Sequence, residues 1–319
     1  MIRRRHFLLA ASVLGLAKPS RAAATLTVLI GAETGSATDT LARVCLPFLA
    51  RHLKLATIGL HDIPGGAGLA AAQALAQASP TGTTLGWAVT PTLPARMVDH
   101  GGGNLMQRIL LLGAVQREPI VFVAPPATRL DSVQDIIERA AGNAASVRLG
   151  TPPPGSAPHL AALRLQALTG TSLNIVAFPS ADAVRQAAAS GKVAAATLGL
   201  SNAIGDLRNG RVVGLGIADD NRAELFPDMP PVRDCGIDLT AVIRRGLAAP
   251  AGLPDETAAQ LRKALEAVAI DSDFSVQAGN SGFLATWIDG RDWTAEASAE
   301  RTELAGIWAT EPWLGGTSG

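Results

Sequence analysis

Residues 26–53 read LTVLIGAETGSATDTLARVCLPFLARHL, and this stretch decides the fold. Its first five residues form an apolar run that predicts a β-strand at 26–30, and apolar residues then recur at helical spacing from 38 to 53. Ser36, Thr38 and Asp39 lie at the start of the helical pattern and are residue types that cap helix N-termini. The stretch therefore predicts a strand, a polar loop and a helix, which is the repeating unit of an α/β fold.

The same alternation continues along the chain. Apolar runs predict further strands at 84–89, 109–115, 120–124, 146–150, 173–178, 193–198 and 212–218. Helical spacing predicts helices at 66–78, 130–141, 157–169, 181–190, 255–269 and 293–310. Alternating strands and helices favour layers built around mostly parallel sheets, in which ligands bind where strands end and helices begin.

Length and composition restrict the function classes. The 319 residues suffice for two domains of about 150 residues each. Apolar residues make up 48% and charged residues 17%, as expected for a globular protein with a large core. Aromatic residues make up only 4% and tyrosine is absent, which disfavours single-stranded nucleic acids and oligosaccharides because their binding sites use aromatic platforms.

The first 22 residues have the pattern of a signal peptide. Arg3, Arg4 and Arg5 precede an apolar stretch at 7–17, and small residues follow around Ala22, so we expect export to the periplasm. The string at 4–8, RRHFL, is also similar to a twin-arginine signal, and an ordinary secretory signal is the other interpretation.

The charge balance of the chain changes when this segment is removed. The segment contains five of the 27 basic residues and none of the 27 acidic ones, so the remaining chain has an excess of five acidic residues. This excess disfavours nucleic acid as a partner, and it means that any anion site must be created locally.

Metal sites, cofactors and common catalytic motifs are not indicated. The five histidines show no metal-ligand spacing, so neither a metal nor another cofactor is expected. Ser156 and His159 are three residues apart at a predicted helix start, where they cap and pack more readily than they form a catalytic pair, so hydrolase activity is only a remote alternative. An oxidising compartment permits a disulfide between Cys45 and Cys235. The sequence does not decide between this disulfide and two free thiols.

Four strand–helix junctions are rich in glycine, serine, threonine or proline, at 33–39, 64–68, 151–156 and 178–180. Free backbone N–H groups and the positive end of the helix dipole suit an anion at such points. Helix capping alone explains any one of these loops, but several in one chain favour a shared anion cleft.

At these loops the sequence resembles the Bug family, the extracytoplasmic receptors of tripartite tricarboxylate transporters. The family pattern P-P-G-G-x-T-D followed by L-A-R corresponds to ETGSATD at 33–39 and LAR at 41–43. The patterns P-G-A-G-G, A-x-P-D-G-Y-T-L and G-S-x-x-H-L correspond to PGGAG at 64–68, ASPTGTTL at 78–85 and GSAPHL at 155–160. The patterns L-x-P-D-V-P-T-V and L-L-A-P-A-G-T-P correspond to LFPDMPPV at 225–232 and LAAPAGLP at 247–254.

The resemblance implies a type II periplasmic-binding-protein fold, with two α/β domains joined by a two-segment hinge and a ligand cleft between them. Domain 1 would contain residues 23–124 and 213–319, and domain 2 residues 125–212. The implied function is capture of a small organic carboxylate for membrane permease subunits. Because the sequence shows no catalytic motif, no enzymatic activity is expected, and the oligomeric state stays open with a monomer as the default. A ligand-sensing adaptor for a membrane signalling partner has the same fold and is the second hypothesis.

The predicted ligand-binding residues come from the loops that match the family and from neighbouring positions. They are Thr34, Gly35, Ser36, Asp39, Thr90, Thr92, Gly155, Ser156, His159, Phe178, Ser180, Asn202 and Arg244.

Two departures from the family pattern bear on the ligand. Glu33 introduces an acid beside the carboxylate loop and either faces the cleft or faces solvent. Arg244 and Arg245 replace an aromatic pair, so Arg244 could clamp a carboxylate through two hydrogen bonds or could lie in a surface arginine pair.

Overall fold

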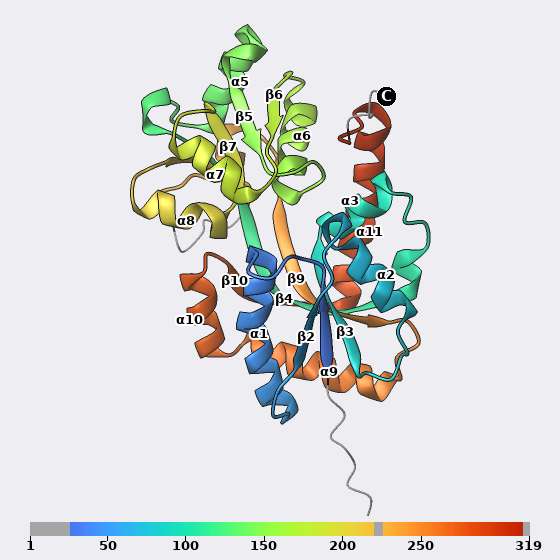
Figure 1. Ribbon diagram of the computed structural model, residues 1–319. Coiled ribbons are helices and arrows are strands. Elements are labelled where there is room, and N and C mark those ends of the chain that lie inside the picture. Colours follow the sequence, from blue (N-terminus) through green and yellow to red (C-terminus); the bar gives the residue numbers. More distant parts are fainter. Residues whose placement is uncertain (1–25, 220–225, 315–319) are drawn as a thin grey trace, which may run out of the picture.

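The structure is a computed structural model that describes residues 26–219 and 226–314. The predicted signal peptide at 1–22 lies outside the described residues. Two α/β domains stack on one another, and two strands run between them (Figure 1). The fold class expected from the sequence is therefore confirmed.

The first domain contains a six-stranded sheet with helices on both faces. In sheet order its strands are β2 (Gly59–Asp62), β1 (Thr27–Ile30), β3 (Thr84–Thr90), β9 (Val242–Pro250), β4 (Ile109–Ala124) and β10 (Leu284–Asp289). β1 is parallel to β2 and β3, whereas β9 is antiparallel to both β3 and β4. The helices α1 (Ala37–Leu53), α9 (Asp255–Ala269) and α10 (Ser272–Asn280) share one core cluster with the sheet. The helices α2 (Leu69–Gln77), α3 (Thr92–Asp99), α4 (Leu105–Arg108) and α11 (Gly290–Thr310) share the cluster on the other face.

The second domain contains a five-stranded sheet with a similar arrangement. In sheet order its strands are β6 (Asn174–Ala177), β5 (Arg148–Thr151), β7 (Ala195–Gly199), the second half of β4, and β8 (Val213–Ile217). The helices α5 (Val133–Gly142), α6 (Ala157–Thr169), α7 (Ala181–Ala189) and α8 (Leu200–Arg208) cover it. Short 3₁₀ turns lie at η1 (Gly66–Gly68), η2 (Pro126–Thr128), η3 (Ala144–Ser146) and η4 (Val232–Cys235).

The two crossing segments are β4 and β9. β4 is a single strand of 16 residues that belongs to both sheets, although the sequence predicted two separate strands at 109–115 and 120–124. The family resemblance implies a return to the first domain at residue 213. In the structure β8 still pairs with β4 in the second sheet, residues 232–243 contribute to the second core, and the chain returns along β9.

Several elements are shifted from, or missing from, the sequence prediction. The helix predicted at 66–78 begins at Leu69, because Gly65, Gly66, Ala67 and Gly68 all have positive φ and cannot form its first turn. The sequence patterns do not predict β2, β9, β10, α3, α4, α8 or α10. Among the described residues, no helix combines the length and apolar character needed to cross a bilayer.

The two cysteines are free and belong to different parts of the fold. Cys45 is buried in the core of the first domain, where burial raises the pKa of its thiol to about 12. Cys235 is half-buried beside the core of the second domain. The bridge that the sequence left open is therefore not formed in this structure.

A phenylalanine cluster provides a test of the core of the first domain. Phe274 on α10 is fully buried and its ring centroid lies 5.4 Å from that of Phe48 and 6.2 Å from that of Phe283. We expect Phe274→Ala to reduce stability by about 3–5 kcal/mol because it leaves a cavity among these rings. Thermal unfolding will measure the loss. Val276→Ala on the same helix is the control, since Val276 is 64% exposed and its truncation should change stability by less than about 0.5 kcal/mol. Equal losses in the two variants would contradict this assignment of the core.

Candidate functional site

The candidate site lies where the carboxyl ends of the parallel strands in the two sheets face each other. In the first domain β1 leads into α1 and β3 leads into α3. In the second domain β5, β6 and β7 lead into α6, α7 and α8. The two edges touch, because Arg96 of α3 donates a 3.1 Å hydrogen bond to the carbonyl oxygen of Pro154, just before α6. The start of α8 likewise lies against the first domain, since a Cβ added to Gly282 would overlap the backbone of Ser201.

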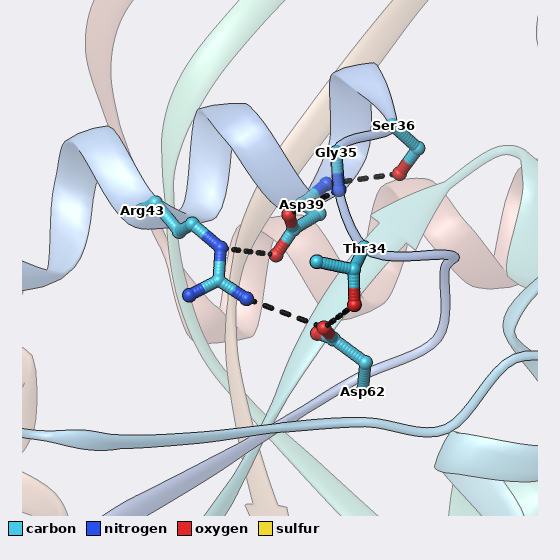
Figure 2. A network of polar contacts seen from close by, with 6 residues as sticks. All are labelled: Thr34, Gly35, Ser36, Asp39, Arg43 and Asp62. Atoms are coloured by element: carbon cyan, nitrogen blue, oxygen red, sulfur yellow. Dashed lines mark hydrogen bonds and ion pairs between the residues drawn. The ribbon is translucent and has the colours of Figure 1, made fainter.

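The first predicted loop is held by two carboxylates of the protein itself (Figure 2). The N–H of Gly35 donates to Asp39 Oδ2 at 2.7 Å, and the Thr34 hydroxyl donates to Asp62 Oδ2 at 2.5 Å. Ser36 caps α1 by accepting a hydrogen bond from the N–H of Asp39. Two groups predicted to bind a ligand carboxylate, Thr34 and Gly35, are therefore already paired with internal carboxylates.

Arg43 joins these two carboxylates. Its Nε lies 2.7 Å from Asp39 Oδ1 and its terminal nitrogen lies 3.2 Å from Asp62 Oδ2 (Figure 2). Burial alone would raise the pKa of Asp39, but Arg43 and the N–H of Gly35 more than compensate and lower it below the ordinary value. Asp39 is therefore charged and orders the loop, and the nearby Glu33 is exposed.

Thr90 and Thr92, at the end of β3, differ in how deeply they are buried. Thr90 is fully buried, and its hydroxyl accepts a 3.0 Å hydrogen bond from Trp293 Nε1 on α11. Thr92 is the first residue of α3 and is half-exposed. Only Thr92 of this pair is positioned to meet a ligand at the strand ends.

The start of α6 contains an unsatisfied hydroxyl. Ser156 occupies the N-cap position but makes no capping bond, and its Oγ is buried without a hydrogen-bond partner among the described residues. The N–H of Gly155 instead donates to His159 Nδ1, at 3.4 Å. Because Nδ1 accepts, the ring of His159 is in the neutral form, and burial together with the positive charge of Arg96 lowers its pKa to about 4.

Arg96 is the residue that the sequence analysis missed. It is 5% exposed, pairs with Asp99 on its own helix and reaches across to Pro154. A Cβ added at position 155 would overlap the guanidinium of Arg96, so only glycine at this position leaves room for the arginine. A signal was present, because an arginine between Ala95 and Met97 in an apolar stretch predicts a buried charge that needs a partner.

The remaining predicted residues are distributed over the second domain and the hinge. Phe178 is half-buried against the second core, and Ser180 is exposed and caps α7 by accepting from the N–H of Ala183. Asn202 is half-buried in the first turn of α8.

Arg244 on β9 is engaged by acids of α11. Its Nε lies 2.6 Å from Glu296 and its NH1 group lies 3.1 Å from Glu300. Burial raises the pKa of Glu300 to about 7, even though Arg244 and Arg164 act in the opposite direction. In this structure the guanidinium of Arg244 therefore has two carboxylate partners within the protein.

Gly155 and Gly170 allow the contact with Arg96 to be tested. Both flank α6 and both have left-handed backbones, with φ of +74° and +63°, but a Cβ at Gly170 meets nothing within 4 Å. We expect Gly170→Ala to cost about 1–2 kcal/mol from its backbone alone. Gly155→Ala should cost about 1–3 kcal/mol more, because Arg96 must leave its position. Thermal unfolding will measure both losses, and small-angle X-ray scattering should show separated domains only in Gly155→Ala. Identical behaviour of the two variants would contradict the contact between domains.

The low pKa of His159 predicts a dependence of stability on pH. Between about pH 6.5 and pH 4 the unfolded chain binds a proton at His159 that the folded chain excludes, so the stability is fully present above pH 6.5 and falls as pH is lowered. The loss should reach at most about 3 kcal/mol. Chemical unfolding at several pH values, compared with His159→Gln, isolates this contribution. A His159 imidazole that titrates near pH 6.5 by NMR would contradict the prediction.

Comparisons with known proteins agree on one family. The family model described as "Tripartite tricarboxylate transporter family receptor" (TctC) matches residues 42–293. The chain is similar to a UPF0065 protein of Bordetella bronchiseptica, with 28% identity over 277 residues that cover 84% of this chain and 81% of the relative. Among solved structures, MatC (Rpa3494) from Rhodopseudomonas palustris with bound malate has a TM-score of 0.73 and 23% identity, and the match covers 89% of this chain and 98% of MatC. R. palustris Rpa4515 with adipate has a TM-score of 0.77 and 19% identity, and the match covers 90% of this chain and 96% of Rpa4515. The family model spans most of the chain, so this protein belongs to the TctC family of tripartite tricarboxylate transporter receptors.

Proposed function

We propose that this protein is a periplasmic receptor that captures a small organic carboxylate between its two domains and presents it to the membrane permease subunits of a tripartite transporter. Membership of the TctC family supports the receptor role. MatC with malate and Rpa4515 with adipate share the fold, and they support a carboxylate as the ligand. The predicted signal peptide at 1–22 supports export, and a monomer is sufficient because both walls of the cleft belong to one chain.

The observation that supports the ligand site most directly is the buried Oγ of Ser156. A buried hydroxyl without a partner costs about 1–3 kcal/mol, so a ligand that accepts its hydrogen bond recovers that cost. The hydroxyl lies at the N-terminus of α6, a helix of 13 residues whose free N–H groups and dipole favour an anion. Both properties favour an anionic oxygen, and a carboxylate supplies one.

Closure of the cleft follows from contacts that join the two domains. Arg96 reaches Pro154, and Arg164 on α6 pairs with Glu303 on α11 at 2.6 Å. A ligand that touches both walls favours the arrangement in which these contacts form, because it binds that arrangement more tightly than the open one. The closed form is the one that we expect a permease to accept.

The geometry of Ser156 and His159 supports binding rather than catalysis. A serine nucleophile needs a hydrogen bond to its base, but Ser156 Oγ has no partner among the described residues and His159 Nδ1 is occupied by the N–H of Gly155. We therefore propose that the protein is not an enzyme.

Replacing Ser156 tests the binding site. We expect Ser156→Trp to abolish binding of carboxylates, because the indole fills the space in front of the α6 N-terminus and removes the hydroxyl. Isothermal titration of the exported protein with malate, adipate, citrate, hexanoate and phenylacetate will first find the ligands that bind. In the unsubstituted protein, a ligand at 100 times its Kd should add about 2.7 kcal/mol of stability, which a thermal-shift experiment can detect.

Ser190→Trp is the matched control. Ser190 is exposed at the opposite end of α7 from the helix starts that face the cleft, so its replacement should leave affinity unchanged. Retained affinity in Ser156→Trp would refute the proposed site, and release of a chemically altered ligand would refute the receptor role.

A further inference from the structure

An apolar cavity lies in the first domain, between the sheet and α2, and nothing in the proposed function accounts for it. Its volume is about 170 Å³. An apolar cavity of about 150 Å³ in a protein core holds a benzene molecule, so this one has room for a phenyl ring or a short aliphatic chain. Its walls come from β1, β3, α2 and α3, together with Ile109 and Ala248 of the hinge strands.

The cavity opens at the strand ends that form the candidate site. The residues of its rim are half-exposed: Gly31 after β1, Thr38 in α1, Gly68 before α2, and Thr92 at the start of α3. The residues deeper in the cavity are buried, and they include Leu29, Leu75, Leu93 and Ile109. Thr92 belongs both to this rim and to the ligand residues predicted from the sequence, and one turn further along α3 Arg96 contacts Pro154 before α6. The rim therefore lies on the side of the first domain that contacts the start of α6.

Small residues create the space. Ala88 of β3 and Ala71 and Ala72 of α2 line the cavity, where larger side chains would fill the space. Gly86 instead packs against Leu75, and Gly31 packs against Gly68, since a Cβ on either glycine would overlap its neighbour. The void therefore depends on the alanines of β3 and α2.

The chemistry of the lining selects an apolar group. None of the residues described as lining the cavity is charged, and only Thr38, Trp87 and Thr92 carry polar side-chain atoms. A carboxylate placed in this lining would lose its hydration without gaining a charged partner, and such a burial is strongly unfavourable. A hydrocarbon group gains free energy with each buried methylene.

The arginines near the proposed cleft give a second reason to expect an apolar group, and not a second carboxylate, on the ligand. Arg43 pairs with Asp39 and Asp62, Arg96 pairs with Asp99, and Arg244 pairs with Glu296 and Glu300. Each of these guanidinium groups already has a carboxylate partner within the chain, so a second carboxylate on the ligand would have to displace one.

We propose that the ligand is a monocarboxylate with a compact apolar tail, a short aliphatic chain or a phenyl group, which enters this cavity while the carboxylate stays at the cleft. This inference rests on the proposed function, because the receptor must first bind a carboxylate at the helix N-termini. It goes further by excluding short dicarboxylates as the preferred class.

A chain-length series tests the inference on the unsubstituted protein. Isothermal titration of the exported protein with propanoate, butanoate, pentanoate and hexanoate should show an affinity that increases by about fourfold per methylene. Phenylacetate should bind at least as well as hexanoate, and succinate should bind no better than propanoate. This series does not depend on any variant folding correctly.

Filling the cavity with a larger side chain should remove the increase of affinity with chain length. Ala71 lines the cavity and is 5% exposed, and Ala71→Leu should reduce the affinity for hexanoate at least about tenfold while leaving that for propanoate unchanged. Ala72→Leu is the alternative variant if Ala71→Leu does not fold. Ala74→Leu adds the same bulk to α2 outside the cavity and should leave both affinities unchanged.

The outcomes separate the two proposals. If malate, adipate or succinate binds while hexanoate and phenylacetate do not, the apolar-tail inference is overturned and the receptor function stands. An equal loss of hexanoate affinity in Ala71→Leu and Ala74→Leu also overturns the inference, because the cavity is then not the tail site. If the folded protein binds no carboxylate of either kind, the proposed function itself fails.

Discussion

The ion pair between Glu118 and Arg245 lies where the chain passes from one domain to the other, and the rest of the structure is arranged around it. Glu118 on β4 is fully buried and Arg245 on β9 is 4% exposed, with 2.6 Å between Glu118 Oε2 and the Arg245 guanidinium. The other carboxylate oxygen accepts hydrogen bonds from the N–H and the hydroxyl of Ser201, at 2.9 and 2.6 Å. One side chain therefore connects both crossing strands to the first turn of α8. Removing one member of such a pair is strongly unfavourable, by about 3–5 kcal/mol, because the other charge stays buried without a partner.

The backbone packs closely around the Glu118–Arg245 ion pair, where β4 and β9 pass between the domains. A Cβ added to Gly199 would overlap the Glu118 carboxylate, and a Cβ added to Gly246 would overlap the backbone of Gly113 and Ala114. Arg117, the neighbour of Glu118, forms a bidentate pair with Asp219 beyond β8, so the crossing is held through charged groups in both directions. Breaking these pairs would leave buried charges without partners, so the proposed closure is better described as a twist of β4 and β9 than as a break in either strand.

The charged residues of the two crossing strands explain why the sequence predicts β1 correctly but not β4 and β9. The unit at 26–53 has a clean apolar run and a capped helix, and the structure has β1 and α1 there, with Ser36 as the N-cap. The sequence analysis divided β4 into two strands because residues 116–119, QREP, interrupt its apolar run. β9 is not predicted because Arg244 and Arg245, its third and fourth residues, interrupt its apolar run. In both strands the polar residues have partners that lie far away in the sequence, so local patterning could not identify them as strand residues.

The candidate site was predictable to the extent that it depends on backbone and capping motifs. The family motifs located the starts of α1 and α6, and the loops at 33–39 and 151–156 do lie at strand ends. Arg96 belongs to no motif and acquires its position only when α3 packs against the second domain. The cavity could not be predicted either, because Ala71, Ala72, Gly86 and Ala88 are common residue types in a chain that is rich in small residues. Their effect arises only when α2 is placed over β3.

The distribution of charge limits how this cleft can bind an anion. The chain without its first 22 residues has an excess of acidic groups, so its overall field does not attract a carboxylate from a distance. Near the cleft, Arg43, Arg96 and Arg244 are each neutralised by acids of the protein. The proposed carboxylate would therefore be held by N–H groups and hydroxyls, of which Ser156 is the clearest candidate, and such contacts do not depend on a net positive charge. Such hydrogen bonds are charge-assisted on the ligand's side only and lack the bidentate geometry of a guanidinium clamp, so a further source of affinity would strengthen binding. Under the proposal above, burial of hydrocarbon in the cavity of the first domain is that source, and the polar cleft and the apolar cavity are two parts of one binding site.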